Sequence, residues 1–189
     1  MVGDRKTELL EITIGLIATR GYDSFSYADL AQASGLTKAS VHHHFPGKED
    51  LAVAVLDHLN ATLIAPMQVC LQEQGPAALG LVMQSLGQRD WGAQVCPFAS
   101  MHAQFNVLPI RVQQRLTEVT ALEVQVFAAL LQAHATQPGM RLLVEPDVAA
   151  RILLSAAKGA LFYGRAMGGT WLTGVVPPLM ELILVQDAV

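Results

Sequence analysis

Residues 27–44, which read YADLAQASGLTKASVHHH, decide the fold of this chain. They predict a short helix over 27–33, a tight turn at Ser34-Gly35-Leu36, and a second short helix over 38–44. Gly35 can adopt a turn conformation that a side chain would resist. Small or apolar side chains let the two helices cross closely: Ala28, Leu30, Ala31 and Val41. This is the sequence pattern of a helix-turn-helix unit.

Capping residues flank both helices. Ser26 with Asp29 three positions later is close to a capping box, and Thr37 is a suitable N-cap for the helix that follows. Upstream, residues 4–20 carry a wide apolar stripe that predicts another helix, and Gly21 is suited to end it. The sequence therefore predicts a three-helix head at the N-terminus.

Helical signals continue through the rest of the chain, whereas strand signals are weak. Glycine and proline residues separate the predicted segments. These segments are 48–73, 77–88, 97–106, 109–135, 146–167 and 176–187. We therefore expect an all-α fold, with a head over 1–47 carrying the helix-turn-helix and a larger C-terminal helical bundle over 48–189.

Composition narrows the class of protein. Of 189 residues, 52% are hydrophobic and only 15% are charged, so apolar surface is left to cover and a homo-oligomer is expected. The longest uncharged stretch, 91–110, contains two prolines and several polar residues, which argues against a membrane span. Charged residues crowd 4–11, which argues against a signal peptide. We expect a soluble, cytoplasmic protein.

The head resembles a known family. Gly21-Tyr22 and the run 26–51 are similar to the N-terminal domain of TetR-type transcriptional regulators, over about the first 55 residues. The most diagnostic part is the segment His44-Phe45-Pro46-Gly47-Lys48, followed by two acidic residues and Leu51. Two later segments, 96–98 and 158–161, are more loosely similar to ligand-binding domains of that family.

This resemblance implies a dimeric regulator that binds a palindromic double-stranded DNA operator. Lys38 and Ser40 would face bases or phosphates, Thr37 would cap the recognition helix and touch phosphate, and His43 and Lys48 would contact the backbone. The chain has His42 where the family usually has tyrosine. The predicted DNA-binding residues are Tyr27, Thr37, Lys38, Ala39, Ser40, His42, His43 and Lys48.

The charge of the head conflicts with this expectation at first sight. Residues 1–60 hold five basic and eight acidic side chains, a net charge of −3 with histidine neutral. However, residues 38–48 contain two lysines and three histidines and no acid, and average charge does not determine the local field. We expect few phosphate contacts and a slope of log K against log salt shallower than roughly −8.

The bundle is rich in methionine and aromatic side chains, which suit either a core or an irregular apolar ligand. Neutral polar residues within 91–110 favour a pocket for an uncharged or weakly charged small-molecule effector of unknown identity. Cys96 precedes a predicted helix start, so it is either a sensing thiol or a small buried hydrophobe. The predicted ligand-binding residues are Met67, Met83, Trp91, Cys96, Phe98, Met101, His102, Phe105, Phe127 and Tyr163.

The last two predicted helices suit a dimer face, because the first of them is apolar over most of its circumference. The alternative is that both helices close the subunit's own core. The predicted interface residues are Ile152, Leu153, Ala156, Ala160, Tyr163, Leu179, Leu182 and Ile183.

The leading hypothesis is thus a ligand-released, TetR-type repressor. The alternative is a helical ligand-binding module without DNA-binding activity. An enzyme is not expected, since no nucleophile with a nearby base, paired acids or phosphate loop is present. No metal or cofactor is expected, because neither the two cysteines nor the adjacent histidines have ligand spacing.

Overall fold

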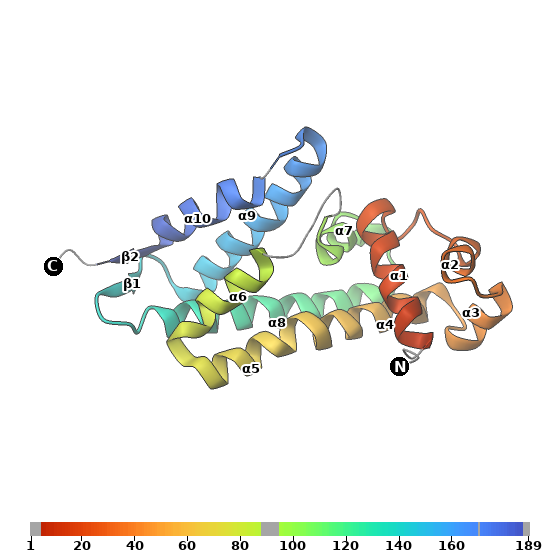
Figure 1. Cartoon of the computed structure of the whole chain (residues 1–189), viewed down its shortest axis with the longest axis horizontal. Coiled ribbons are helices and arrows are strands. Elements are labelled where there is room, and N and C mark those ends of the chain that lie inside the picture. Colours follow the sequence, from red (N-terminus) through yellow and green to blue (C-terminus); the bar gives the residue numbers. More distant parts are fainter. Residues whose placement is uncertain (1–4, 88–94, 170, 187–189) are drawn as a thin grey trace. The chain divides into compact units, whose positions relative to one another are not determined.

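The computed structural model describes residues 5–87, 95–169 and 171–186, and these are almost entirely helical (Figure 1). The predicted all-α class, with an N-terminal helix-turn-helix and a C-terminal helical bundle, is confirmed. The chain forms two compact units. Unit 1 comprises Met1–Asn60 and Gln94–Val119, and unit 2 comprises Ala61–Ala93 and Thr120–Val189.

Unit 1 is built from the N-terminal helices and a returning segment. Its elements are α1 (Arg5–Arg20), α2 (Tyr27–Ser34), α3 (Lys38–His44), α4 (Lys48–Leu59), α7 (Pro97–Ala103), the 3-10 turn η3 (Phe105–Val107) and the first part of α8 (Ile110–His134). Helix α1 packs against α2, α4 and α7. The core includes fully buried Leu9, Ile17, Leu51 and Met101.

The local signals of the head form as the sequence predicts. Ser26 and Asp29 make both hydrogen bonds of the capping box at the start of α2. Gly35 ends α2 in the left-handed region at φ 67°, and Thr37 Oγ1 accepts the backbone N–H of Ser40 at 3.1 Å. Each of these interactions lies within a few residues along the chain, so the sequence alone determines it.

The predicted helix over 48–73 is interrupted. After α4 the chain makes a π-helical segment, η1 (Asn60–Ile64), and continues as α5 (Ala65–Gln74), in which Pro66 occupies the first turn. Proline has no N–H to donate to the carbonyl one turn earlier, which accounts for the altered hydrogen bonding before it. The boundary between the two units falls at Asn60.

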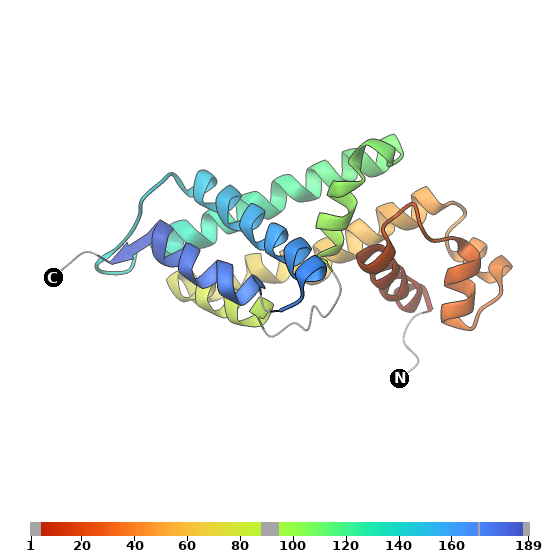
Figure 2. The ribbon, with the colours of Figure 1, turned by 90° about the horizontal axis from the view of Figure 1, so that it is seen from above.

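Unit 2 contains η2 (Gly75–Ala77), α6 (Ala78–Gly87), the rest of α8, α9 (Pro146–Met167) and α10 (Trp171–Ile183). Helices α9 and α10 lie side by side (Figures 1 and 2). Glu123 on α8 and Lys158 on α9 form an ion pair at 2.5 Å that is largely removed from solvent. Two strands, β1 (Met140–Leu142) and β2 (Leu184–Gln186), pair antiparallel, with Leu142 opposite Leu184.

The prediction of a last helix over 176–187 is wrong at both ends. Helix α10 begins at Trp171, contains Pro177 and Pro178, and ends at Ile183, where β2 follows. Proline inside a helix costs about 3 kcal/mol but does not forbid the helix when packing compensates. Here the compensation comes from the contact with α9 along the helix.

Two helical stretches, Lys48–Gly87 and Ile110–His134, are long and apolar enough by composition to cross a membrane. Core helices of water-soluble proteins pass the same test. Both stretches carry charged partners: Arg115 on α8 donates to Asp57 on α4 at 2.7 Å. Because ionised side chains are costly in hydrocarbon, this ion pair argues against a membrane span in either stretch.

Candidate nucleic-acid interface

The second helix of the motif presents its start to solvent. Thr37, Lys38 and Ala39 are exposed, whereas Val41 is fully buried and fixes the rotation of α3 about its own axis. Helix α3 packs on α2. A short helix with an exposed, unobstructed N-terminal turn can enter a major groove, because the recognition helix of this motif reads bases through its first residues.

Tyr27, the first residue of α2, supports α3 from its buried side. Its side chain is buried, its hydroxyl donates to the Phe45 carbonyl at 2.9 Å, and its ring lies 4.5 Å from that of His42. Burial raises the pKa of the Tyr27 hydroxyl to about 12, so it remains a hydrogen-bond donor at physiological pH. Tyr27 therefore supports α3 from its buried side. The sequence predicted that it contacts DNA together with the exposed residues of α3.

Lys48 has an internal role in the free protein. Its ammonium donates to the Phe25 carbonyl at 2.5 Å and lies 4.3 and 4.7 Å from the ring centres of Phe25 and Tyr22. Burial lowers the pKa of Lys48. The side chain therefore joins the start of α4 to the loop after α1, a contact that sequence spacing did not indicate. Its predicted contact with phosphate stays a prediction.

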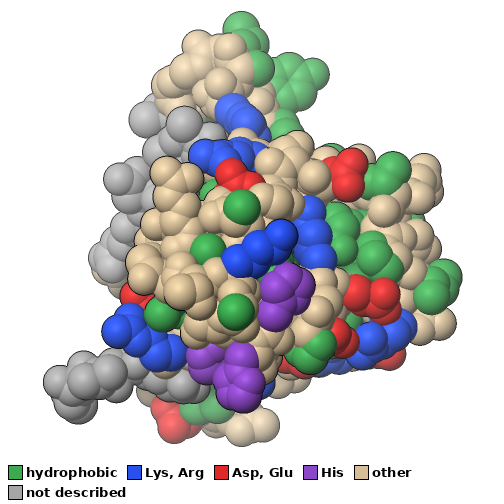
Figure 3. Space-filling model, turned by 90° about the vertical axis from the view of Figure 1, so that its right-hand side faces the viewer, with side chains coloured by type: hydrophobic (Ala, Val, Ile, Leu, Met, Phe, Trp, Pro, Cys, Tyr) green, Lys and Arg blue, Asp and Glu red, His purple; other side chains and the backbone are tan. Residues whose placement is uncertain are grey.

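Acidic side chains of unit 1 are engaged with arginines. Asp29 pairs with Arg20 at 3.3 Å, and Asp50 pairs with Arg111 at 3.1 Å. Hydrogen bonds from the side chain and the backbone N–H of Ser26 hold the pKa of Asp29 below its usual value. Lysine, arginine and histidine side chains are prominent on the face of the molecule seen in Figure 3. These pairs place a guanidinium group beside two of the acidic side chains of the head.

Two neutral polar residues of 95–110, Ser100 and Gln104, form hydrogen bonds with backbone groups at the end of α1. Ser100 donates to the Ile17 carbonyl at 2.7 Å, and the Gln104 side-chain oxygen accepts the Tyr22 N–H at 2.6 Å. Gly21 has φ 85°, and a Cβ there would lie 2.7 Å from the Gln104 amide. These contacts satisfy backbone groups at the C-terminal end of α1.

The predicted ligand-binding residues are divided between the two units. Cys96, Phe98, Met101, His102 and Phe105 lie in unit 1, where Phe98 and Met101 are core residues. Met67, Met83, Phe127 and Tyr163 lie in unit 2, and Trp91 lies outside the described residues. Cys96 is buried at the N-cap of α7, as the interpretation of a small buried hydrophobe requires.

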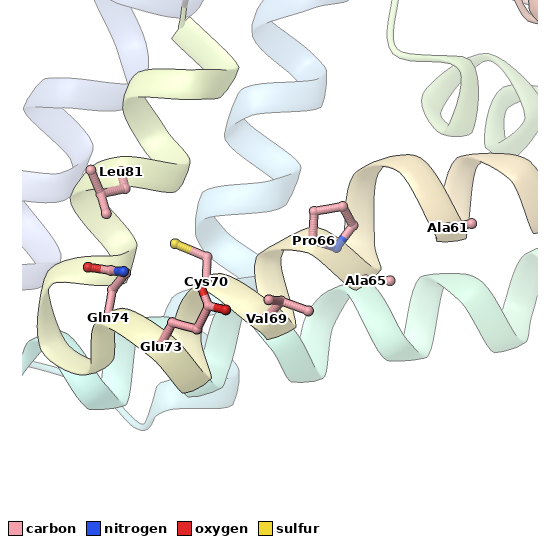
Figure 4. A pocket seen from close by; sticks show the side chains of 8 residues that line it. All are labelled: Ala61, Ala65, Pro66, Val69, Cys70, Glu73, Gln74 and Leu81. Atoms are coloured by element: carbon pink, nitrogen blue, oxygen red, sulfur yellow. The ribbon is translucent and has the colours of Figure 1, made fainter.

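A shallow groove in unit 2 was not predicted. It has a volume of about 530 Å³ and runs along α5 towards α6 (Figure 4). Apolar groups, one thiol, one carboxylate and one amide line it: Ala61, Ala65, Pro66, Val69, Cys70, Glu73, Gln74 and Leu81. A spacing of four residues in 61–65–69–73 places these positions on one helical face, and that spacing was the available sequence signal.

The predicted interface residues fall into two groups. Ile152, Tyr163 and Leu182 are exposed, the last two at 59% and 69%, whereas Ala156 and Leu179 are half-buried. Leu153, Ala160 and Ile183 are buried within the subunit, so they pack in its own core. Further exposed apolar side chains on α9 were missed: Val148, Phe162 and Met167.

Comparison with known sequences agrees with this geometry. Residues 9–55 match the family described as bacterial regulatory proteins, tetR family. The HTH-type transcriptional repressor KstR2 of Rhodococcus jostii is 40% identical over 52 residues, which is 28% of this chain and 26% of that protein. The matched segment thus spans about a quarter of the length of this curated relative.

Comparison with solved structures extends to nearly the whole chain. A TetR-family transcriptional regulator from Agrobacterium tumefaciens superposes with a TM-score of 0.85 at 25% identity, covering 96% of this chain and 98% of the other. A TetR transcriptional regulator from Legionella pneumophila gives 0.83 at 23% identity, with the same coverage of both chains.

The helix-turn-helix and the helical bundle define the class of helical regulators that carry an N-terminal DNA-binding domain. Within that class, residues 9–55 match the tetR family of bacterial regulatory proteins, and the chain as a whole has the fold of the TetR-family regulator from Agrobacterium tumefaciens.

Proposed function

We propose that this protein is a cytoplasmic, ligand-released transcriptional repressor that binds a palindromic DNA operator as a homodimer. The observation that carries the proposal is the exposed N-terminal turn of α3, with Lys38 and Ala39 in solvent on a helix held by buried Val41. Thr37, Ser40, His42 and His43 complete the predicted contact surface. Bases would be read from this turn, and phosphates would pair with its cations.

Dimerisation is supported by the apolar surface of α9 and α10. Ile152, Tyr163 and Leu182 are exposed in a chain with only 15% charged residues. Burying such a surface against a second copy removes it from water. Two-fold symmetry would then present two α3 helices to two half-sites, which is why a palindromic operator is part of the proposal.

Control by a small molecule is the remaining part. The groove along α5 offers a mainly apolar surface, and Met67, Met83 and Phe127 belong to the same unit. An effector that favours a conformation with misplaced α3 helices would weaken DNA binding, and DNA would weaken effector binding by the same factor. A thermal-shift screen of metabolites tests this part, since a ligand specific to the folded state raises Tm.

The test of DNA binding is the substitution Lys38→Ala. We expect weaker binding, and a slope of log K against log salt that is shallower by about 2, because a dimer loses two phosphate contacts. The measurement is fluorescence anisotropy on duplexes from the DNA flanking the protein's own gene.

The matched control for this test is Arg151→Ala. It removes one positive charge from an exposed ion pair on α9 and should leave binding unchanged. Equal loss in both variants would show that only total charge matters. Unchanged binding in a folded Lys38→Ala protein would count against α3 as the contact surface.

A further inference from the structure

Helix α3 carries three consecutive histidines, but they do not face the same way. At about 100° per residue, His43 lies almost opposite buried Val41, whereas His44 lies within about 60° of it. The burial agrees, since His42 and His43 are exposed and His44 is half-buried. His42 and His43 are therefore the two exposed histidines of α3, and His42 lies within about 40° of Lys38 around the helix axis.

The surroundings of His42 can hold a protonated ring without rearrangement. Its Nδ1 lies 3.3 Å from the Pro46 carbonyl, which only accepts, so Nδ1 carries the proton of that bond. A second proton would enter at Nε2 and leave the bond intact. The Tyr27 ring centre lies 4.5 Å from that of His42 with the two rings tilted by 57°, and aromatic rings attract cations.

Helix α3 itself contains no acidic side chain. Lys38 shares the helix, Tyr27 lies beneath on α2, and Lys6 of α1 sits 5.6 Å from the Phe45 ring centre. Lys48 begins α4 and is held by the Phe25 carbonyl. The nearest acids in sequence, Glu49 and Asp50, pair with Arg111 at 3.4 and 3.1 Å.

We propose that protonation of His42 and His43 makes the operator affinity of this protein increase as the pH falls from 8 to 6. The inference rests on the proposed function, because it concerns the same DNA-binding surface. Histidine is the side chain whose charge changes in this range, and each imidazolium on the surface can pair with a phosphate and release a counterion. A dimer then gains two to four positive charges at the DNA.

The test is binding of the full-length protein to a fluorescent duplex, recovered by selection with this protein at pH 8.0. Affinity and salt slope are measured at pH 6.0, 7.0 and 8.0 at fixed ionic strength. We expect about tenfold tighter binding at pH 6.0 and a salt slope steeper by about 2 to 4, at about 0.9 for each added contact.

Histidine substitutions test which residues cause the pH response. His42→Gln with His43→Gln should remove most of the pH response, and His44→Gln should keep it. His43→Lys should bind more tightly at pH 8.0 and lose the part of the response due to His43, because its charge no longer titrates there. His58→Gln removes the 2.6 Å contact with Glu11 and should keep the response, which separates DNA contacts from packing of α1 on α4.

The possible outcomes distinguish a failure of this inference from a failure of the proposed function. A duplex bound with equal affinity and slope at all three pH values overturns the inference and leaves the proposed function standing. A response that persists in the double variant, with unchanged circular dichroism, also overturns it. Failure to recover any duplex in selections at both pH 8.0 and pH 6.0 overturns both.

Discussion

The two compact units differ in how many large hydrophobic side chains they leave exposed. Among the described residues, unit 1 has two large exposed hydrophobic side chains, Val107 and Ile110, whereas unit 2 has ten. Six of those ten lie on α9 and α10. Unit 1 therefore completes a core within one chain and exposes a polar helix, and unit 2 retains apolar surface that a second copy can cover.

The largest expected effect comes from breaking the apolar face of unit 2. Tyr163→Glu combined with Leu182→Glu places two charges on that face. We expect the dissociation constant of the dimer to increase by about 100-fold or more, which is the size of effect found at central interface residues. Light scattering after size-exclusion chromatography measures the mass. Val107→Glu, a similar change on unit 1, should leave the mass unchanged; a dimer that survives the double change would place the interface elsewhere.

A smaller effect is expected at Gly21 in unit 1, where the Gln104 side chain lies close to the backbone. Gly21→Ala puts a side chain at φ 85° and 2.7 Å from the Gln104 amide, so we expect a loss of about 1–3 kcal/mol in unfolding free energy. Chemical denaturation measures it. Gly15→Ala, inside α1 and with nothing within 4 Å of the new Cβ, should instead stabilise by up to about 1 kcal/mol.

The smallest expected effect concerns the two thiols, one in each unit. Cys96 is buried at the start of α7, whereas Cys70 is half-buried and lines the groove of unit 2. We expect iodoacetamide to modify Cys70 about tenfold faster than Cys96 in the native protein, because access limits the reaction. Peptide mass spectrometry over time gives both rates, and Cys70→Ser provides the reference. Faster modification of Cys96 would restore it as the sensing candidate.

Sequence reasoning succeeded where structure depends on neighbours in the chain. The capping box at Ser26, the turn at Gly35 and the N-cap at Thr37 each involve residues no more than five positions apart. Their physics is local, so the head and its recognition helix could be predicted closely.

Contacts that join distant segments could not be predicted from the sequence. Gln104 was one of the polar residues that predicted a ligand pocket, and its side-chain oxygen accepts the N–H of Tyr22, 82 positions away; Ser100 donates to the carbonyl of Ile17, 83 positions away. Lys48 contacts Phe25 across 23 positions, and α10 accommodates two prolines because it packs along α9. Such partners depend on the folded arrangement, which the order of residues along one helix does not reveal.

Whether α3 reads a palindromic operator is tested by selecting bound sequences from random 40-base-pair duplexes with the purified full-length protein, with Lys38→Ala in parallel. We expect the wild-type protein to enrich an inverted repeat, with half-sites about one helical turn apart, and the variant to enrich it weakly or not at all. No enrichment by a folded, dimeric wild-type protein would show that α3 does not bind such an operator, and equal enrichment by both proteins would show that Lys38 does not contact it.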